Sequence, residues 1–212
     1  MKKKVFILGD SICIYYSPYL LEMLKNDFDC MTKKGRAEAM KDLDVPIKAN
    51  AGNTNNILSF LKLEEENGNL NYDYLVFNSG LHDIVYSYDK ETQILATKPK
   101  VSKEKYYQNL NTIIDKVKKY NIKPIFVTTT PIEDERHNSR ASFKRYGADV
   151  ISYNEVAKKV MSEREIPVID LFEFTESLEG ERFRDHAHYL DEVAEKQAKF
   201  INGEFRKIVE NY

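Results

Sequence analysis

The 212-residue sequence contains no tryptophan, two cysteines, six prolines and eight glycines. Cys13 and Cys30 are too few for a disulfide framework, so both are expected to be free thiols. The low content of glycine and proline excludes a collagen-like chain, and the 42% of hydrophobic residues excludes a disordered one. No repeat or linker divides the chain, and we predict a single domain over residues 1–212.

Neither sign of charge is in excess, because 32 Lys and Arg residues face 34 Asp and Glu residues. This balance gives no general attraction to nucleic acids or anionic membranes, and we predict neither as a partner. No apolar run approaches the roughly 18 residues of a membrane span. The basic start at Met1–Lys4 is followed by an apolar run that ends at Leu8, too short for a secretion signal. We therefore predict a cytoplasmic location, with export by an unusual route as the alternative.

Short apolar runs alternate with longer amphipathic segments. Runs typical of strands lie at 5–8, 74–77, 125–128 and 168–171, with a weaker edge strand expected at 45–49. Their continuous apolar character favours parallel strands covered by helices on both faces. Stripes typical of helices lie at 110–117, 153–160 and 194–208, and another helix is expected from about 17 to 28. The alternation predicts a doubly wound α/β layer sandwich with a mostly five-stranded parallel sheet.

Two segments, 84–104 and 131–148, are longer than ordinary connections in a compact domain. Both follow predicted strand ends, where open α/β sheets form their ligand crevice. We therefore expect both segments to lie near the functional site.

Gly9-Asp10-Ser11 directly follows the first predicted strand. Gly9 would allow a sharp turn, and a hydroxyl just beyond the carboxyl end of a strand would point into the crevice. Ser11 is therefore a candidate nucleophile. A turn in which Asp10 or Ser11 caps the following helix explains the same residues, so this motif is weak on its own.

Asp185-His186-Ala187-His188 could supply the base that a nucleophilic serine needs. His188 can fold back within one turn onto Asp185 and turn its other ring nitrogen outward, so we prefer it to His186 as the base. A metal site is the competing interpretation, since all three side chains are metal ligands. Their spacing is poor for that purpose and no cluster elsewhere completes a site, so no metal is predicted.

Four sequence blocks resemble those of the SGNH hydrolases, also called the GDSL esterase/lipase family. They are Gly9-Asp10-Ser11-Ile12, Asn50-Ala51-Gly52-Asn53, Gly80-Leu81-His82-Asp83 and Asp185-x-x-His188. Their order and separations match the family over nearly the whole chain. The resemblance implies a flavodoxin-like three-layer α/β/α sandwich that hydrolyses esters or thioesters without a cofactor, often removing acetyl groups from carbohydrates.

The resemblance also implies roles for individual residues. Ser11 matches the family nucleophile, with Asp185 and His188 as its acid and base, and the backbone N–H groups of Ser11 and Gly52 match two oxyanion donors. The block around His82 departs from the family, which usually has an asparagine there as a third donor. A bacterial subset shares Gly-Leu-His-Asp with this chain, and also resembles it in Thr128-Thr129-Thr130-Pro131 and Glu135-Arg136-His137-Asn138.

His82 could keep the donor role, because even a neutral imidazole carries one N–H group. Its alternatives are a structural histidine or a base that competes with His188, and Asn78 and Asn53 are substitutes for the missing amide. Further candidates for substrate contact are Asp10, Asn53, Asp83, Arg136 and His137, although Asp83 also suits a structural role.

We expect a serine esterase acting on a small-molecule ester, with an acetyl ester of a carbohydrate or related metabolite as the first choice. An acyltransferase using the same site and a binding protein that has lost turnover are the alternatives. The sequence predicts no oligomeric state.

Overall fold

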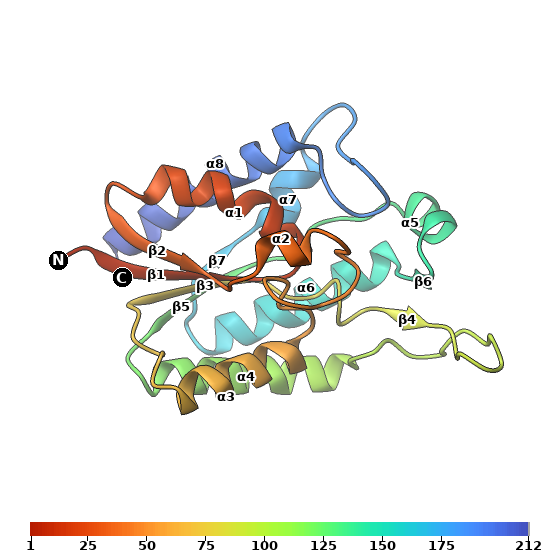
Figure 1. The fold of residues 1–212 in the computed structure, drawn as a ribbon, viewed down its shortest axis with the longest axis horizontal. Helices are drawn as coiled ribbons and strands as arrows, with labels where there is room; N and C mark the ends of the chain where they lie inside the picture. Colours follow the sequence, from red (N-terminus) through yellow and green to blue (C-terminus); the bar gives the residue numbers. More distant parts are fainter. Residues whose placement is uncertain (212) are drawn as a thin grey trace.

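In the computed structural model, which describes residues 1–211, a five-stranded parallel sheet lies between two layers of helices (Figure 1). The strands, in their order across the sheet, are β2 (Phe28–Thr32), β1 (Lys3–Leu8), β3 (Tyr74–Phe77), β5 (Lys123–Val127) and β7 (Val168–Ile169). One face is covered by α1 (Ser11–Leu24), α7 (Leu171–Glu176) and α8 (Asp191–Glu210), and the other by α3 (Thr54–Glu66), α4 (Lys103–Lys118) and α6 (Gly147–Glu163). The predicted three-layer α/β/α sandwich is confirmed.

The core lies on both faces of the central strands. All four residues of β3 are buried, as are the last four of β1, because each strand has a helical layer on either side. The predicted helical stripes supply the covering side chains: Ile113, Ile114 and Val117 of α4 are fully buried. Their burial gives the sheet a rigid base from which its loops extend.

The edge strand is β2 at Phe28–Thr32, and the prediction of a strand at 45–49 is wrong. β2 pairs in parallel with β1, from Lys3 beside Phe28 to Ile7 beside Thr32. Its residues are only partly buried and include a polar aspartate, so the run lacks the continuous apolar character of a central strand. Val45 and Ile47 are instead exposed in a loop.

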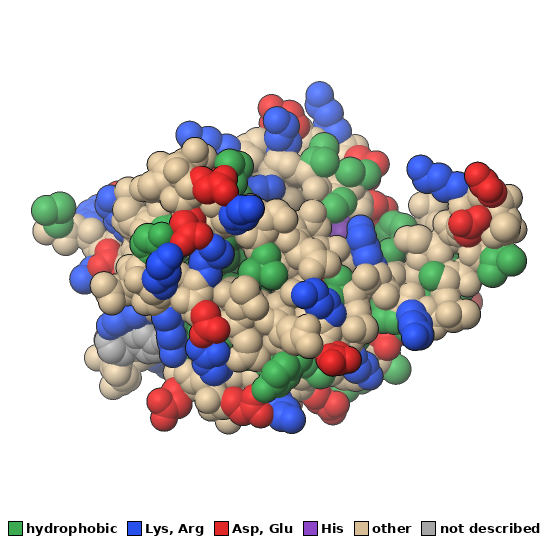
Figure 2. Space-filling view, turned by 90° about the horizontal axis from the view of Figure 1, so that it is seen from below, with side chains coloured by type: hydrophobic (Ala, Val, Ile, Leu, Met, Phe, Trp, Pro, Cys, Tyr) green, Lys and Arg blue, Asp and Glu red, His purple; other side chains and the backbone are tan. Residues whose placement is uncertain are grey.

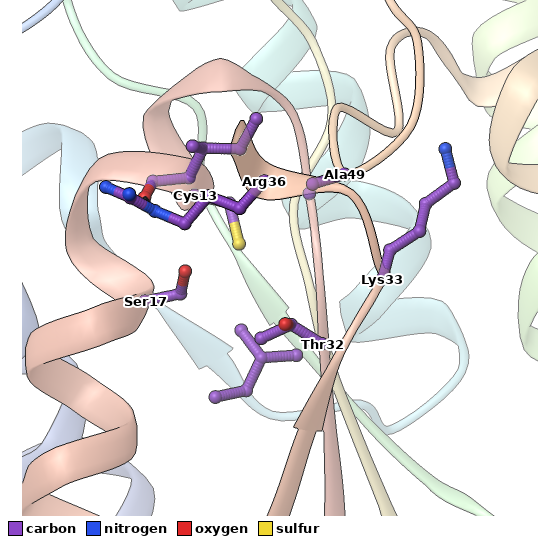
Figure 3. Close-up of a pocket in the computed structure, with 9 residues that line it drawn as sticks. Cys13, Ser17, Thr32, Lys33, Arg36 and Ala49 are labelled. Atoms are coloured by element: carbon purple, nitrogen blue, oxygen red, sulfur yellow. Dashed lines mark hydrogen bonds between the residues drawn. The ribbon is translucent and has the colours of Figure 1, made fainter. Parts of the chain in front are cut away.

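Helix α1 begins at Ser11 rather than near residue 17, and it ends at Leu24. Asp10 caps it, with the side-chain Oδ1 accepting a hydrogen bond from the Ile12 amide at 3.0 Å. Pro18 inside the helix has no N–H to offer the Ile14 carbonyl. The side chain of Arg36, from α2 (Arg36–Ala39), donates to that carbonyl instead at 3.3 Å, and it lines a small cavity of about 20 Å³ beside α1 (Figure 3).

The two long segments meet each other. β4 (Tyr86–Ser87) pairs antiparallel with β6 (Phe143–Lys144), and α5 (Asp134–Arg140) precedes β6. The chain beyond β4 projects from the body of the molecule, and a notch separates this projection from the rest (Figure 2). A histidine side chain is visible beside that notch. These segments therefore form one small substructure next to the ends of the strands.

Candidate active site

The candidate site lies at the carboxyl ends of β1 and β3. In the strand order β2-β1-β3-β5-β7, β2 is added on one side of β1 and all later strands on the other side. The crevice of flavodoxin-like sheets lies at this switch point, between β1 and β3. Ser11 follows β1, and His82 follows β3. A backbone hydrogen bond of 2.9 Å from the Ala51 amide to the Gly9 carbonyl brings the Gly52 segment to the same place.

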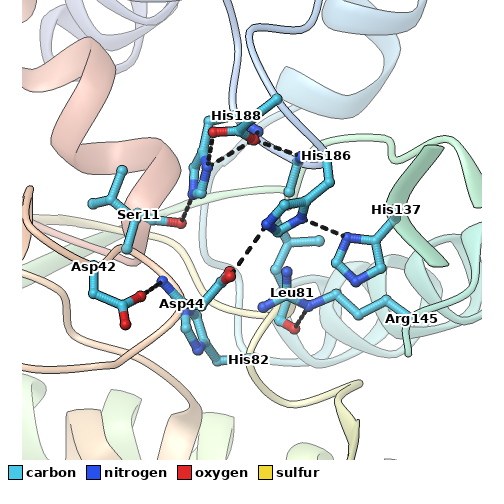
Figure 4. A network of polar contacts seen from close by, with 12 residues as sticks. Ser11, Asp42, Asp44, Leu81, His82, His137, Arg145, His186 and His188 are labelled. Atoms are coloured by element: carbon cyan, nitrogen blue, oxygen red, sulfur yellow. Dashed lines mark hydrogen bonds and ion pairs between the residues drawn. The ribbon is translucent and has the colours of Figure 1, made fainter. Parts of the chain in front are cut away.

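A continuous hydrogen-bonded line joins three of the predicted residues (Figure 4). His188 Nε2 lies 2.8 Å from Ser11 Oγ. On the other side of the ring, His188 Nδ1 lies 2.9 Å from Asp185 Oδ2. Ser11 and His188 are both buried, with exposed fractions of 4% and 3%. This geometry allows the imidazole to take the serine proton while the carboxylate stabilises the resulting charge.

A short hairpin explains how Asp185 and His188 come together. The Arg184 amide donates to the His188 carbonyl at 2.8 Å, and Phe183 pairs with Tyr189, whose ring stacks on it at 4.8 Å. Tyr189 also donates its hydroxyl hydrogen to the Pro131 carbonyl at 2.6 Å. These contacts force the intervening residues into one turn, as the spacing of three residues predicts.

The Asp185 carboxyl is held in its ionised form. Partial burial opposes ionisation, but hydrogen bonds from His188 and from the Ala187 amide outweigh it and keep the pKa of Asp185 well below its usual range. The Tyr15 ring packs against the His188 imidazole, with 5.5 Å between ring centroids. Tyr15 lies four residues after Ser11 on α1, so one helix presents both the hydroxyl and the packing surface for the ring.

His186 faces away from Ser11. Its Nε2 lies 3.1 Å from Asp44 Oδ2, and its Nδ1 lies 3.0 Å from His137 Nδ1. The adjacent position thus diverges from His188, as we expected from the sequence. Asp185, His186 and His188 do not converge on one point, and residues 1–211 contain no group of three or more acidic, histidine or cysteine side chains arranged to hold a metal ion.

The turn before Ser11 depends on a close approach rather than on an unusual backbone angle. A Cβ atom on Gly9 would lie 1.8 Å from Asn78 Oδ1, so only glycine fits there. Asn78 Nδ2 donates to Asp10 Oδ1 at 3.3 Å. This bond uses one of the two N–H groups of the Asn78 side chain. Asp10 is fully buried and also forms its capping bond, so its carboxylate supports the turn, and contact with a substrate stays a prediction.

The Gly52 amide lies in the expected region but already has an acceptor. It donates to Asn50 Oδ1 at 3.0 Å. Gly52 has a φ of +67°, and a Cβ atom there would lie 2.5 Å from the Pro46 Cβ, so the position requires glycine. The Ser11 amide, first in α1, has no acceptor within the helix. The two predicted donors therefore differ. The Ser11 amide can donate to a new partner directly, whereas the Gly52 amide must first give up its hydrogen bond to Asn50 before it can donate to a substrate oxygen.

His82 is a neutral, buried imidazole. Burial, followed by the nearby Arg145 charge, lowers the pKa of His82 well below its usual value. Its Nε2 lies 3.5 Å from Asn50 Nδ2, at the outer limit of a hydrogen bond. An amide nitrogen can only donate, so in this contact His82 Nε2 is the acceptor and the ring proton belongs on Nδ1. Donation from Nε2 to a substrate would need the other tautomer.

Two further candidates for substrate contact, Asp83 and Asn53, form hydrogen bonds within the scaffold. Asp83 Oδ1 accepts from the Thr54 hydroxyl at 2.6 Å and from the Thr54 amide at 3.0 Å, and Asp83 is fully buried. Asn53 caps α3 by accepting from the Asn56 amide at 3.0 Å. Contact with a substrate stays a prediction for both, and the cap uses only the oxygen of Asn53, so its Nδ2 remains available as the substitute amide donor. Together these bonds fix the turn after β3 to the start of α3.

The remaining pair of candidates is also internally engaged. Arg136 forms ion pairs with Glu133 at 2.8 Å and Glu181 at 3.0 Å, away from Ser11. His137 is fully buried, and burial lowers its pKa to about 3, so it stays neutral. Direct contact of either residue with a substrate stays a prediction.

Several residues of the site were not predicted from the sequence: Tyr15, Asp44, Asn50 and Arg145. Asn50 belongs to a recognised block, so its position was a usable signal. Asp44 and Arg145 lie in irregular segments and reach the site through contacts with residues distant in the sequence. No local pattern marks them.

The fold and the hydrogen-bonded serine define a class of three-layer α/β/α proteins with a serine at the carboxyl end of the first strand, and comparisons with known proteins identify the family. The sequence profile of the GDSL-like lipase/acylhydrolase family matches residues 5–201, so the chain belongs to this family. It is an ester-hydrolysing enzyme, and the resemblance to SGNH hydrolases is confirmed.

Solved structures share the fold over almost the whole chain. A lipase/acylhydrolase from Enterococcus faecalis has a TM-score of 0.66 at 19% identity, covering 97% of this chain and 96% of that one. A GDSL-like lipase from Bacteroides thetaiotaomicron has a TM-score of 0.67 at 14% identity, covering 98% and 88%. An acetyl xylan esterase has a TM-score of 0.62 at 18% identity, covering 97% and 99%. At these identities the likeness concerns the fold.

A curated relative matches part of the chain. The uncharacterized lipoprotein YqeF of Bacillus subtilis is 28% identical over 102 residues, which are 42% of this chain and 42% of that protein. No helix within residues 1–211 is long and apolar enough to cross a membrane. The cytoplasmic location stays a prediction.

Proposed function

We propose that the enzyme is a serine esterase that removes a small acyl group, with acetyl as the first choice, from a carbohydrate or related metabolite. The observation that carries this proposal is the line from Ser11 Oγ through His188 to Asp185. The acetyl xylan esterase of the same fold supports the substrate class by analogy.

In the proposed mechanism, Ser11 Oγ attacks the ester carbonyl while His188 Nε2 takes its proton. Asp185 stabilises the imidazolium that forms. The carbonyl oxygen gains negative charge, and the backbone N–H groups of Ser11 and Gly52 stabilise this oxygen by donating hydrogen bonds to it. His188 then protonates the leaving alcohol, and the acyl group remains on Ser11. Water attacks this acyl-enzyme by the same route and releases the acid.

One experiment tests the proposal directly. A fluorescent fluorophosphonate should label the purified wild type but not Ser11→Ala, because only an activated serine reacts. Ser17→Ala is the matched control, since Ser17 is also buried on α1 but lines the small cavity beside that helix, and it should keep the label. Acetate release from acetylated sugars should exceed release of longer acyl groups. A wild type that neither takes the label nor releases acetate refutes the proposal.

A second candidate function is a binding protein that has the fold of the family but no longer turns over a substrate. One observation favours it, namely that the Gly52 amide and His82 are both engaged with Asn50. An unlabelled but stably folded wild type would support that alternative. Transfer to an alcohol is separated from hydrolysis by adding methyl glucoside and comparing acetylated acceptor with free acetate.

A further inference from the structure

Arg145 carries a buried positive charge beside His82 and Asp44. Only 2% of the residue is exposed, and its Nε donates to the Leu81 carbonyl, next to His82, at 2.7 Å. Its guanidinium stacks over the Phe143 ring at 4.7 Å. In Figure 4 this side chain extends from the His137 side toward His82 and Asp44.

The motif around residues 135–138 explains how Arg145 is held in place. Asn138 clamps its backbone on both sides, accepting from the Arg145 amide at 3.1 Å and donating to its carbonyl at 2.8 Å. The His137 ring packs on Phe143, with 5.4 Å between centroids. The guanidinium therefore rests on a rigid platform, which is the arrangement expected of a preorganised binding group.

No carboxylate of the described chain is in direct contact with this charge. Among residues 1–211, no acidic side chain forms an ion pair with Arg145, and its two terminal nitrogens have no hydrogen-bond partner. Neither terminal nitrogen is fully enclosed by protein atoms, so solvent can reach both of them. Burial lowers the pKa of the guanidinium to about 10, so it remains charged at neutral pH. Asp44 and Asp10 attract this charge from a distance, but neither forms an ion pair with it, so its terminal nitrogens are left for a ligand.

Building on the proposed function, we propose that Arg145 binds a carboxylate of the substrate, so that the ester cleaved at Ser11 belongs to an acidic molecule such as an acylated uronic acid or hydroxy acid. A guanidinium with two free terminal nitrogens matches the two oxygens of a carboxylate. The carboxylate would fix the ester relative to the serine, which makes Arg145 a specificity-determining residue.

The surrounding charges favour a carboxylate over a phosphate. Asp44 and Asp10 lie within electrostatic reach of Arg145, and each is engaged elsewhere, with His186 and with the start of α1 respectively. His82 and His137 are neutral because their pKa values are lowered. One guanidinium in this setting compensates a single negative charge better than the two charges of a phosphate monoester.

Two matched substrate pairs test the proposal with the full-length enzyme. The first pair is a mono-acetylated methyl glucosiduronic acid and the corresponding methyl glucoside, and the second is O-acetyl-lactic acid and its amide. The acid of at least one pair should have a kcat/KM about 10- to 100-fold above its neutral partner. Glucuronate should also inhibit more strongly than inorganic phosphate. No preference for the acid in either pair, or stronger inhibition by phosphate, overturns the assignment.

Variants then locate the effect. Arg145→Gln should abolish the preference for the acid, Arg145→Lys should keep part of it, and Arg140→Gln on exposed α5 should leave the ratio as in the wild type. An unchanged ratio in a folded Arg145→Gln protein contradicts the proposal. If Arg145→Gln does not fold, as judged by its melting curve, the wild-type ratios decide. Failure of the proposed function looks different, because the wild type would then take no fluorophosphonate label and cleave none of the four esters.

Discussion

The groups on the two sides of the Ser11 hydroxyl differ in whether their hydrogen bonds already suit the proposed reaction. On one side, His188 and Asp185 are already joined to it by bonds of 2.8 and 2.9 Å. On the other side, the Gly52 amide donates to Asn50, and His82 faces the same asparagine. The proton-transfer side is preorganised, whereas the side that receives negative charge must exchange internal partners for the substrate. Substitutions should therefore have graded effects on the two sides.

The largest loss is expected from Ser11→Ala. Removing the nucleophile should lower kcat for a short-chain p-nitrophenyl ester by on the order of 10⁶-fold, as when a nucleophile is removed from a serine hydrolase. Circular dichroism should stay unchanged, because the Ser11 hydroxyl contacts only His188 among the hydrogen bonds of the described side chains. Full activity in a clean preparation would falsify the role of Ser11.

Asp185→Asn should cost on the order of 10⁴-fold in kcat, since an amide opposite Nδ1 favours the wrong imidazole tautomer. Asp191→Asn is the control, because that aspartate lies nearby at the start of α8 in an exposed ion pair with Arg184. Steady-state kinetics of both variants give the comparison. Similar rates for the two would mean that Asp185 only shapes the hairpin.

A smaller loss is expected on the opposite side. His82→Ala should lower kcat by about 100- to 1000-fold if the imidazole is an oxyanion donor, while His82→Asn should retain much more activity because an amide N–H replaces it. Equal losses would point instead to a structural role. A structural role would also lower the melting temperatures of both variants, whereas loss of a donor alone would leave them unchanged.

The smallest effect on turnover is expected from Asp83→Asn, which acts on stability. Burial raises the pKa of Asp83 to about 7, above its value of roughly 3.9 in the unfolded chain. The folded state thus favours the protonated carboxyl, and the wild type loses stability as the pH rises from about 4 to about 7. The variant lacks this loss, so its melting temperature relative to the wild type should rise over that interval by on the order of 5 °C. A constant difference across this range would contradict the raised pKa.

The sequence predicted the parts of the molecule that local patterns determine. Continuous apolar runs located β1, β3 and β5, and the spacing of Asp185 and His188 predicted their contact. The edge strand β2 was missed because its half-exposed residues lack that pattern. The predicted start of α1 lies too late in the chain because Asp10 caps the helix and Ser11 is its first residue, so one motif is both a helix start and a candidate nucleophile.

The sequence could not predict which polar residues serve the scaffold. Asp83 and Asp10 follow strands at the crevice just as Ser11 does, yet both are buried under hydrogen bonds from neighbouring segments. Arg145 shows the reverse case, because its place depends on Asn138 and on the Leu81 carbonyl 64 residues earlier. Such pairings arise from tertiary contacts and leave no periodic trace.

The separation of 177 residues between Ser11 and His188 has a consequence for biosynthesis. A nascent chain that has exposed α1 and most of the sheet still lacks the hairpin before α8, and with it the general base that we propose. In the proposed mechanism, hydrolysis can begin only after the segment that carries His188 has emerged and docked beside α1. A fragment ending before residue 185 is then expected to be inert toward esters.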